Sequence, residues 1–240
     1  MADVLSEVRG AALWITLNRP DQGNTVTDDM ARELTRLLTQ AGDQAKFVVL
    51  TGAGNDFCIG RGSTSSGAGP VEALQRKRGS DVVFDCYGSV RACSVPVVGL
   101  VRGRAHGFGC SLAGLCDITI AEAGATFRIP EMTHNTMPTM VMSSLIDRVP
   151  AKAIGYLTYT AVTISAERAL TFGIVSNVVA AEMLDGEIGT VCDALTHAPR
   201  PALEGIKEYL RAAREMSVRG AVDYARNIHA TINSSSEMRK

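Results

Sequence analysis

The pattern of apolar and polar positions divides the chain into a first part that favours strands and a later part that favours helices. Residues 4–17 are half-alternating and predict a β-hairpin that turns at Gly10. Unbroken apolar runs at 47–52 and 97–101 predict buried, parallel strands, and 118–121 predicts a further strand. We therefore expect an α/β fold whose β/α part extends to about residue 130.

Helical spacing of apolar residues marks the segments between and after these strands. Thr27 is a typical N-cap for a helix whose apolar residues include Met30, Leu34 and Leu38. Ser165 is predicted to cap a second helix that ends at Gly173, ahead of a strand at 174–179. The same spacing predicts helices at 82–93, 143–148, 151–158, 182–195, 203–216 and 218–232.

Composition limits the classes of protein to consider. A chain of 240 residues with 46% apolar residues is expected to form one large domain, or a core with a small appendage. A net charge of −1 gives no reason to expect nucleic acid or an anionic membrane as a partner. There is no apolar run long enough to span a bilayer and no signal-peptide pattern at the N-terminus.

Cysteine and histidine usage adds to this picture. The six cysteines form no CxxC pair and lie mostly among apolar neighbours, as expected for reduced cysteines of a cytosolic protein. The four histidines are scattered, so no metal site is expected. We therefore predict a cytoplasmic protein.

The most informative stretch follows the predicted strand at 97–101. Gly103, Gly107 and Gly109 precede an apolar segment that carries no charge until Asp117. A strand, a glycine-rich turn and a buried helix present free amides at the helix start, where they bind an anion or an oxyanion that develops during a reaction. The spacing fits neither a P-loop nor the GxGxxG motif. In the alternative interpretation, these glycines only permit tight helix–sheet packing.

Three further features complete the candidate chemistry. Glu131 directly follows Pro130 at the end of an apolar segment, which makes it either a catalytic acid at a strand end or an ordinary surface charge. The Gly/Ser-rich tract 62–69 is either a mobile loop over a site or a plain surface loop. Methionines after His134 either line an apolar pocket or fill the core.

Read together, these segments resemble the crotonase superfamily, also called the enoyl-CoA hydratase/isomerase family. The resemblance covers nearly the whole chain and implies a crotonase-like spiral of ββα units with a helical C-terminal trimerisation region. It implies a core at 1–190 and a C-terminal helical region at 191–240. Five segments carry it, namely LNRPDQGN (17–24), FCIGRGS (57–63), GRAHGFGCSLAGLCDITIA (103–121), FRIPE (127–131) and SAERALTFGIVSNVV (165–179).

The resemblance also implies an activity and a site. Members bind acyl-CoA thioesters and stabilise an enolate with two backbone amides, which are here those of Arg61 and Phe108. Coenzyme A is then part of the substrate and no separate cofactor is needed, and a homotrimer or hexamer is expected. The further residues implied in substrate binding are Asn24, Ile59, Gly60, Gly107 and His134.

Departures from the family pattern bear on the reaction. The hydratases use two glutamates, and here Ser111 stands at the first position and Glu131 at the second. One glutamate suffices to move a proton along a substrate, so double-bond isomerisation is the favoured prediction. The alternatives are a hydratase or hydratase-lyase that uses Ser111, and a CoA-ester-binding protein with little turnover. His106 or His134 is a possible replacement for the missing glutamate. RNA binding, found in one branch of the family, is disfavoured because no Lys/Arg stripe is present.

Overall fold

The computed structural model describes residues 2–62 and 72–239, so most of the predicted mobile loop at 62–69 lies outside the described residues. Its main sheet has six strands in the spatial order β1-β2-β3-β4-β6-β9. β1 and β2 form the predicted antiparallel hairpin, and every later pairing in this sheet is parallel. The strands are β1 Val4–Arg9, β2 Ala12–Leu17, β3 Phe47–Gly52, β4 Val97–Val101, β6 Ile118–Glu122 and β9 Asn177–Val179.

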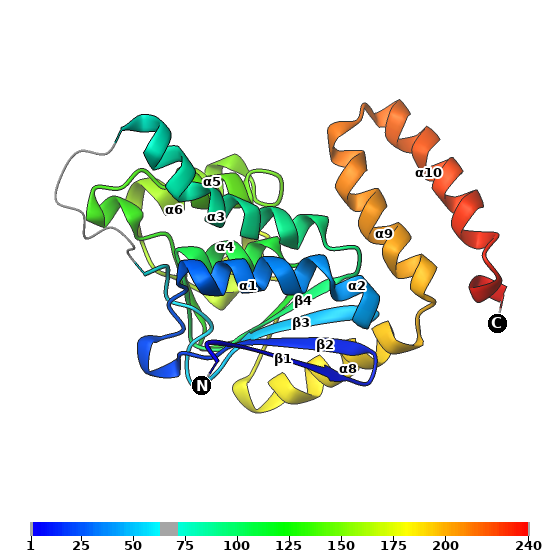
Figure 1. The fold of residues 1–240 in the computed structure, drawn as a ribbon, viewed down its shortest axis with the longest axis horizontal. Coiled ribbons are helices and arrows are strands. Elements are labelled where there is room, and N and C mark those ends of the chain that lie inside the picture. Colours follow the sequence, from blue (N-terminus) through cyan, green and yellow to red (C-terminus); the bar gives the residue numbers. More distant parts are fainter. Residues whose placement is uncertain (1, 63–71, 240) are drawn as a thin grey trace.

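Helices cover both faces of this sheet, which explains why its central strands are unbroken apolar runs. α1 (Asp28–Thr39), α3 (Ala73–Ala92) and α4 (Phe108–Leu115) lie on one face, and α8 (Leu184–His197) lies on the other (Figure 1). The Thr27 hydroxyl caps α1 as predicted, accepting a hydrogen bond from the Met30 amide.

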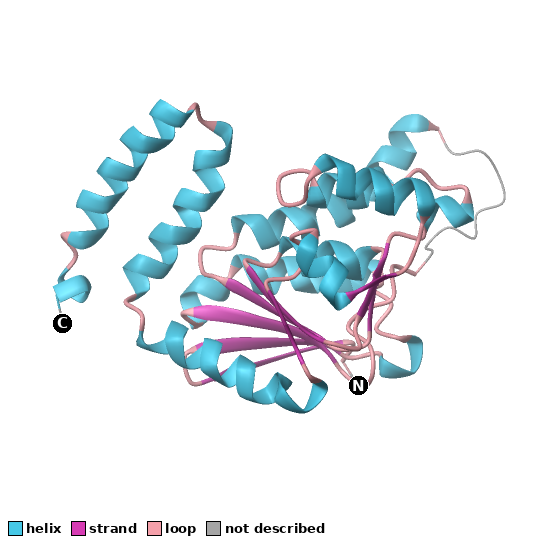
Figure 2. Ribbon diagram, turned by 180° about the vertical axis from the view of Figure 1, so that it is seen from behind, coloured by secondary structure: helices cyan, strands magenta, loops and turns pink. Residues whose placement is uncertain are grey.

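A second, three-stranded sheet was not predicted from the sequence. It consists of β5 (Arg104–His106), β7 (Thr126–Arg128) and β8 (Ile164–Ser165), which are too short to show a period (Figure 2). β5 pairs in parallel with β7, with Ala105 opposite Phe127. Because α4 follows β5 and residue 131 follows β7, this small sheet places two distant segments side by side.

Several predicted boundaries were wrong, as two elements illustrate. α5 (Thr139–Leu145) begins directly after Pro138, earlier than the predicted start at Ser143. The strand predicted at 174–179 is confined to β9, because Ile174 and Val175 donate backbone hydrogen bonds to Ala169 and close the end of the preceding helix. The remaining elements are η1 Pro20–Gln22, α2 Ala41–Gln44, η2 Glu131–His134, α6 Ala151–Thr160, α7 Ala166–Thr171, η3 Ala181–Met183, α9 Arg200–Ala212, η4 Ala213–Glu215, α10 Val218–Asn233 and η5 Ser236–Arg239.

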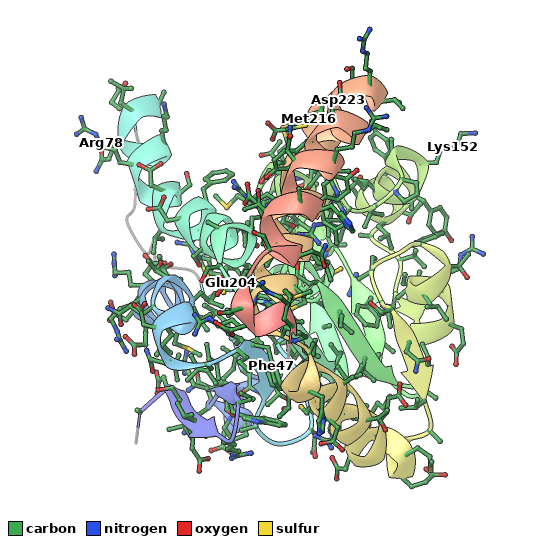
Figure 3. The ribbon with its side chains drawn as sticks, turned by 90° about the vertical axis from the view of Figure 1, so that its right-hand side faces the viewer. Phe47, Arg78, Lys152, Glu204, Met216 and Asp223 are labelled. Carbon is green, nitrogen blue, oxygen red and sulfur yellow. The ribbon has the colours of Figure 1, made fainter. Side chains whose placement is uncertain are left out.

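The C-terminal helices α9 and α10 form a hairpin that stands away from the sheet (Figure 1). Figure 3 shows this hairpin toward the viewer, with Met216 and Asp223 at its far end. The proposed division at 190/191 falls inside α8, which packs on the sheet, so this boundary stays a prediction. Across residues 2–62 and 72–239, none of the helices combines the length and apolar character needed to cross a bilayer.

Candidate active site

The predicted site residues gather around a cavity of about 510 Å³. Its walls come from the loop at 59–62, the middle of α3, the start of α4 and the segment 130–141. The predicted residues that line it are Ile59, Gly60, Arg61, Gly107, Phe108, Glu131 and His134. The structure therefore brings the loop at 59–62 together with the start of α4 and the segment 130–141.

The first predicted amide belongs to Arg61, on a loop that is tied to the Val26 backbone from both sides. The Val26 amide donates to the Gly60 carbonyl over 3.0 Å, and the Gly62 amide donates to the Val26 carbonyl over 2.9 Å. Between them, the Arg61 amide donates to no group within the described part of the chain. The Arg61 guanidinium forms an ion pair with Asp28, 2.6 Å away, so the backbone rather than the side chain is free to act.

The second predicted amide belongs to Phe108, the first residue of α4. Gly107 precedes it and has a φ of +51°. The Gly107 amide donates to the Arg128 carbonyl over 2.8 Å. In the chain as described, the Phe108 amide has no acceptor, as expected for the first turn of a helix. The helix dipole adds positive potential at this point.

Glycine at 107 permits the closest approach in the site. A Cβ atom there would lie 3.0 Å from Oε1 of Glu131 and 3.8 Å from the Cα atom of Gly60. The three segments that carry Arg61, Phe108 and Glu131 therefore converge on one point.

Glu131 is the carboxylate of this cavity, and it begins the short helix η2. Its Oε2 atom is buried and has no hydrogen-bond partner among the described residues. Burial raises the pKa of this carboxyl group, and its own backbone amide and the nearby His134 oppose the rise. A carboxylate with a raised pKa and an oxygen that accepts no hydrogen bond is suited to take and return a proton near neutral pH.

Ser111 does not line the cavity. Its side chain is fully buried, and within the described chain Oγ finds no hydrogen-bond partner, not even the helix carbonyl one turn back. Tyr87 of α3, a residue that sequence reasoning missed, does line the cavity. The Tyr87 ring packs against Phe108 with 5.1 Å between centroids.

Asn24 also lies away from the cavity lining. Its fully buried side chain accepts from the Arg19 amide and donates to the carbonyls of Ala53 and Asp56, at 2.7–2.8 Å. These bonds fix the loop that leads to Phe57 and the first amide, so Asn24 holds this loop in place. Direct contact of Asn24 with substrate stays a prediction.

The two histidines near the motifs have different surroundings. His134 lines the cavity and is exposed. His106 lies outside the cavity lining, with Nε2 3.2 Å from the Thr126 hydroxyl. Burial, with Arg104 and Arg128, lowers the pKa of His106. Of the two, His134 alone has access to the cavity.

The cysteines near the site are buried thiols that are not expected to ionise. Cys58 and Cys110 are fully buried, and burial raises the pKa of each thiol to about 12. None of the six cysteines is in a disulfide. Among the residues that the structure describes, no cluster of three or more His, Cys, Asp or Glu is arranged to hold a metal ion.

Two amides without an acceptor and one desolvated carboxylate thus lie around one cavity, as far as the described residues show. The family model for enoyl-CoA hydratase/isomerase matches residues 7–240, and the chain belongs to this family.

Several named proteins are similar to this chain in sequence or in fold. A Mycobacterium tuberculosis protein named a probable enoyl-CoA hydratase is 32% identical over 205 residues, covering 82% of this chain and 72% of its own. The 2,3-dehydroadipyl-CoA hydratase of Escherichia coli is 25% identical, covering 95% and 89%. The crystal structure of an enoyl-CoA hydratase from Mycobacterium smegmatis has a TM-score of 0.91 at 24% identity, covering 98% and 93%, and shows the shared fold.

Proposed function

We propose that this enzyme acts on an acyl-CoA thioester and forms an enolate, with Glu131 as the base and the Arg61 and Phe108 amides as the oxyanion hole. The observation that carries the proposal is the convergence at Gly107, where Glu131 Oε1 lies beside the turn that bears the second amide. Preorganised amides aimed at developing negative charge are each worth about 3–4 kcal/mol of transition-state stabilisation.

The favoured reaction is migration of a double bond from a 3-enoyl to a 2-enoyl thioester. Glu131 removes a proton from Cα, and the electrons move onto the thioester oxygen, which the two amides bind. The same carboxylic acid then returns the proton to Cγ, the double bond re-forms between Cα and Cβ, and Glu131 is ionised again. In support, Glu131 is the sole carboxylate in the described lining of the cavity.

Incubation with 2-enoyl, 3-enoyl and hydroxycinnamoyl thioesters in D₂O, followed by mass spectrometry, tests this proposal. Isomerisation by one base predicts a shifted double bond with at most one solvent deuteron per turnover and no added water. A product that has gained water, or release of an aldehyde, contradicts the isomerase assignment. Bound thioester with no change in any substrate contradicts the proposal of turnover as a whole.

Hydration or hydratase-lyase chemistry is the second candidate. The observation that favours it is the unpartnered hydroxyl of Ser111, which stands at the position of the family's first glutamate. In this reaction Ser111 would hold a water molecule or a substrate hydroxyl. Ser111 has no exposed surface, so this role requires neighbouring side chains to rearrange.

We propose in addition that the enzyme needs no cofactor besides the coenzyme A of its substrate, and that it assembles through its C-terminal helices. α10 has no buried residue. Its apolar residues Val218 and Val222 are 84% and 47% exposed. On α9, Ile206 and Leu210 are also more than half exposed. A 16-residue helix with an uncovered apolar face requires a partner surface. Light scattering that gives a trimer or hexamer mass supports this assembly, and a monomer mass contradicts it.

A further inference from the structure

Tyr87 is a buried aromatic residue that contacts the oxyanion helix from the side. It lies on α3, is 2% exposed and lines the cavity. Its ring meets the ring of Phe108, tilted by 37°. Phe108 carries the amide assigned above to the oxyanion hole, so a side chain of one helix contacts the residue that provides a donor on another.

The same tyrosine reaches a second residue of α4. Phe108 and Ser111 are three positions apart, and therefore lie on one face of the helix. Burial raises the pKa of the Tyr87 phenol, and the neighbouring Ser111 opposes that rise. Ser111 Oγ is fully buried and forms no hydrogen bond among the described residues, so its hydrogen-bonding capacity is left for a neighbour such as this phenol.

All residues of α4 are buried, and Gly109 packs closely against the Cys58 carbonyl. The N-cap of this helix is Gly107, which has no side chain to cap it. Glycine at a positive φ holds its backbone more loosely than other residues do, because it has access to more conformations. On the side of α3, the ring of Tyr87 contacts the first turn of α4 at Phe108.

We propose that Tyr87 and Ser111 are positioning residues for the Phe108 amide. The ring of Tyr87 supports Phe108, and its hydroxyl engages Ser111 one turn further along the same face. Together they set the direction in which the amide points into the cavity. This inference rests on the proposed function, because it assigns the Phe108 amide to the oxyanion hole.

The proposal also accounts for the serine at the position of the family's first glutamate. A carboxylate at this fully buried position would be desolvated, which is costly for a charge. A hydroxyl instead gives the Tyr87 phenol a polar neighbour without adding a charge. Ser111 then acts through Tyr87 and the helix, and touches neither substrate nor the water of a hydration.

The test uses the infrared carbonyl stretch of a saturated acyl-CoA bound to the full-length enzyme. Two amides that polarise the thioester carbonyl lower its stretching frequency, and this readout does not depend on turnover. Three variants are compared with wild type: Tyr87→Phe, Ser111→Ala and, as matched control, Tyr156→Phe. Tyr156 also packs against a phenylalanine, Phe172, at 6.2 Å, but lies on α6 and outside the cavity.

The expected result is a large frequency shift in wild type and Tyr156→Phe, and a smaller shift in Tyr87→Phe and Ser111→Ala. We expect kcat to fall about tenfold in these two variants with KM within twofold, less than the 100- to 1000-fold loss that follows removal of an oxyanion donor. The double variant is expected to resemble each single variant, because both remove the same contact.

Four other outcomes are distinguishable. No frequency shift in wild type contradicts the proposed oxyanion hole itself. A wild-type shift that persists in both variants, with unchanged kcat, overturns the positioning role. A rise in KM alone in Tyr87→Phe means that the phenol binds substrate directly, and also overturns it. If Tyr87→Phe fails to fold, Ser111→Ala decides, because it removes one oxygen and leaves the aromatic packing unchanged.

Discussion

Two partly buried carboxylates of this enzyme have opposite surroundings. Asp117, at the junction of the core with α9, accepts from the Val97 amide over 2.8 Å and from Lys207 over 2.7 Å. Arg148 lies 3.8 Å from its other oxygen. Glu131, in the cavity, leaves Oε2 without a partner within the described chain.

The difference indicates what each group is for. Because a buried charge without partners is costly, a fold keeps one only where its reactivity is needed. Asp117 joins the C-terminal helices to the sheet, and its oxygens are occupied by that role. Glu131 instead lines the cavity, and its Oε2 atom is left without a partner among the described residues. The predictions below test this contrast in order of expected effect.

Replacing Glu131 by Gln is expected to reduce turnover by about 10²- to 10⁴-fold. It is also expected to increase stability at neutral pH. The folded-state pKa of Glu131 lies above its ordinary value of 4.5, so the folded protein loses stability as pH rises from that value through the raised pKa. Gln removes this loss. Thermal unfolding at pH 7.5 measures the effect, and a variant less stable than wild type there would contradict it.

Replacing Lys207 by Met removes one partner of the buried pair at the junction. Lys207 is 7% exposed, so we expect a loss of about 3 kcal/mol in the free energy of unfolding, with kcat per folded molecule unchanged. Arg226→Met is the control, because its pair with Asp223 is exposed and is worth less than about 1 kcal/mol. Equal urea midpoints for both variants would contradict the structural role of Lys207.

Replacing Gly107 by Ala tests the close approach in the cavity. The added Cβ atom meets Glu131 Oε1 at 3.0 Å, and a left-handed backbone costs a residue with a side chain about 1–2 kcal/mol. Both stability and turnover are expected to fall. Gly79→Ala, in α3 with open space around its Cα, is expected to gain about 0.5–1 kcal/mol instead. Matched urea and activity measurements on the pair separate strain at the site from a general effect of alanine.

The smallest expected effect concerns pH. Since Glu131 acts ionised and burial raises its pKa, kcat/KM is expected to rise with pH through a value above the ordinary pKa of a glutamate. His134 opposes this rise, so His134→Asn is expected to move the acidic limb to higher pH. A limb that moves to lower pH, or one that survives in Glu131→Gln, would mean that another group titrates.

The sequence predicted the elements with a strong period and the segments with special chemistry. The hairpin, the buried strands, the capped helices α1 and α7 and the glycine turn before α4 are confirmed. The converging residues Arg61, Phe108 and Glu131 were identified because the segments that carry them resemble motifs of the family. Their catalytic roles stay predictions.

Other features of the structure leave no pattern in the amino-acid sequence from which they could be predicted. The strands of the second sheet are two or three residues long and owe their form to pairing with each other. Tyr87 occupies an apolar face of α3 and looks like any core position until α4 is packed against it. The burial of Ser111 and the internal hydrogen bonds of Asn24 likewise depend on neighbours that are distant in sequence.

The most direct test of the central claim is exchange of the Cα hydrogen of a saturated acyl-CoA in D₂O, followed by mass spectrometry. Such a thioester has no double bond to move or hydrate, so exchange reports enolate formation alone. The account predicts exchange by wild type and a loss of at least about 100-fold in Glu131→Gln. Exchange at the wild-type rate in that variant, or bound thioester that never exchanges in wild type, would contradict Glu131 as the base of an enolate-forming site.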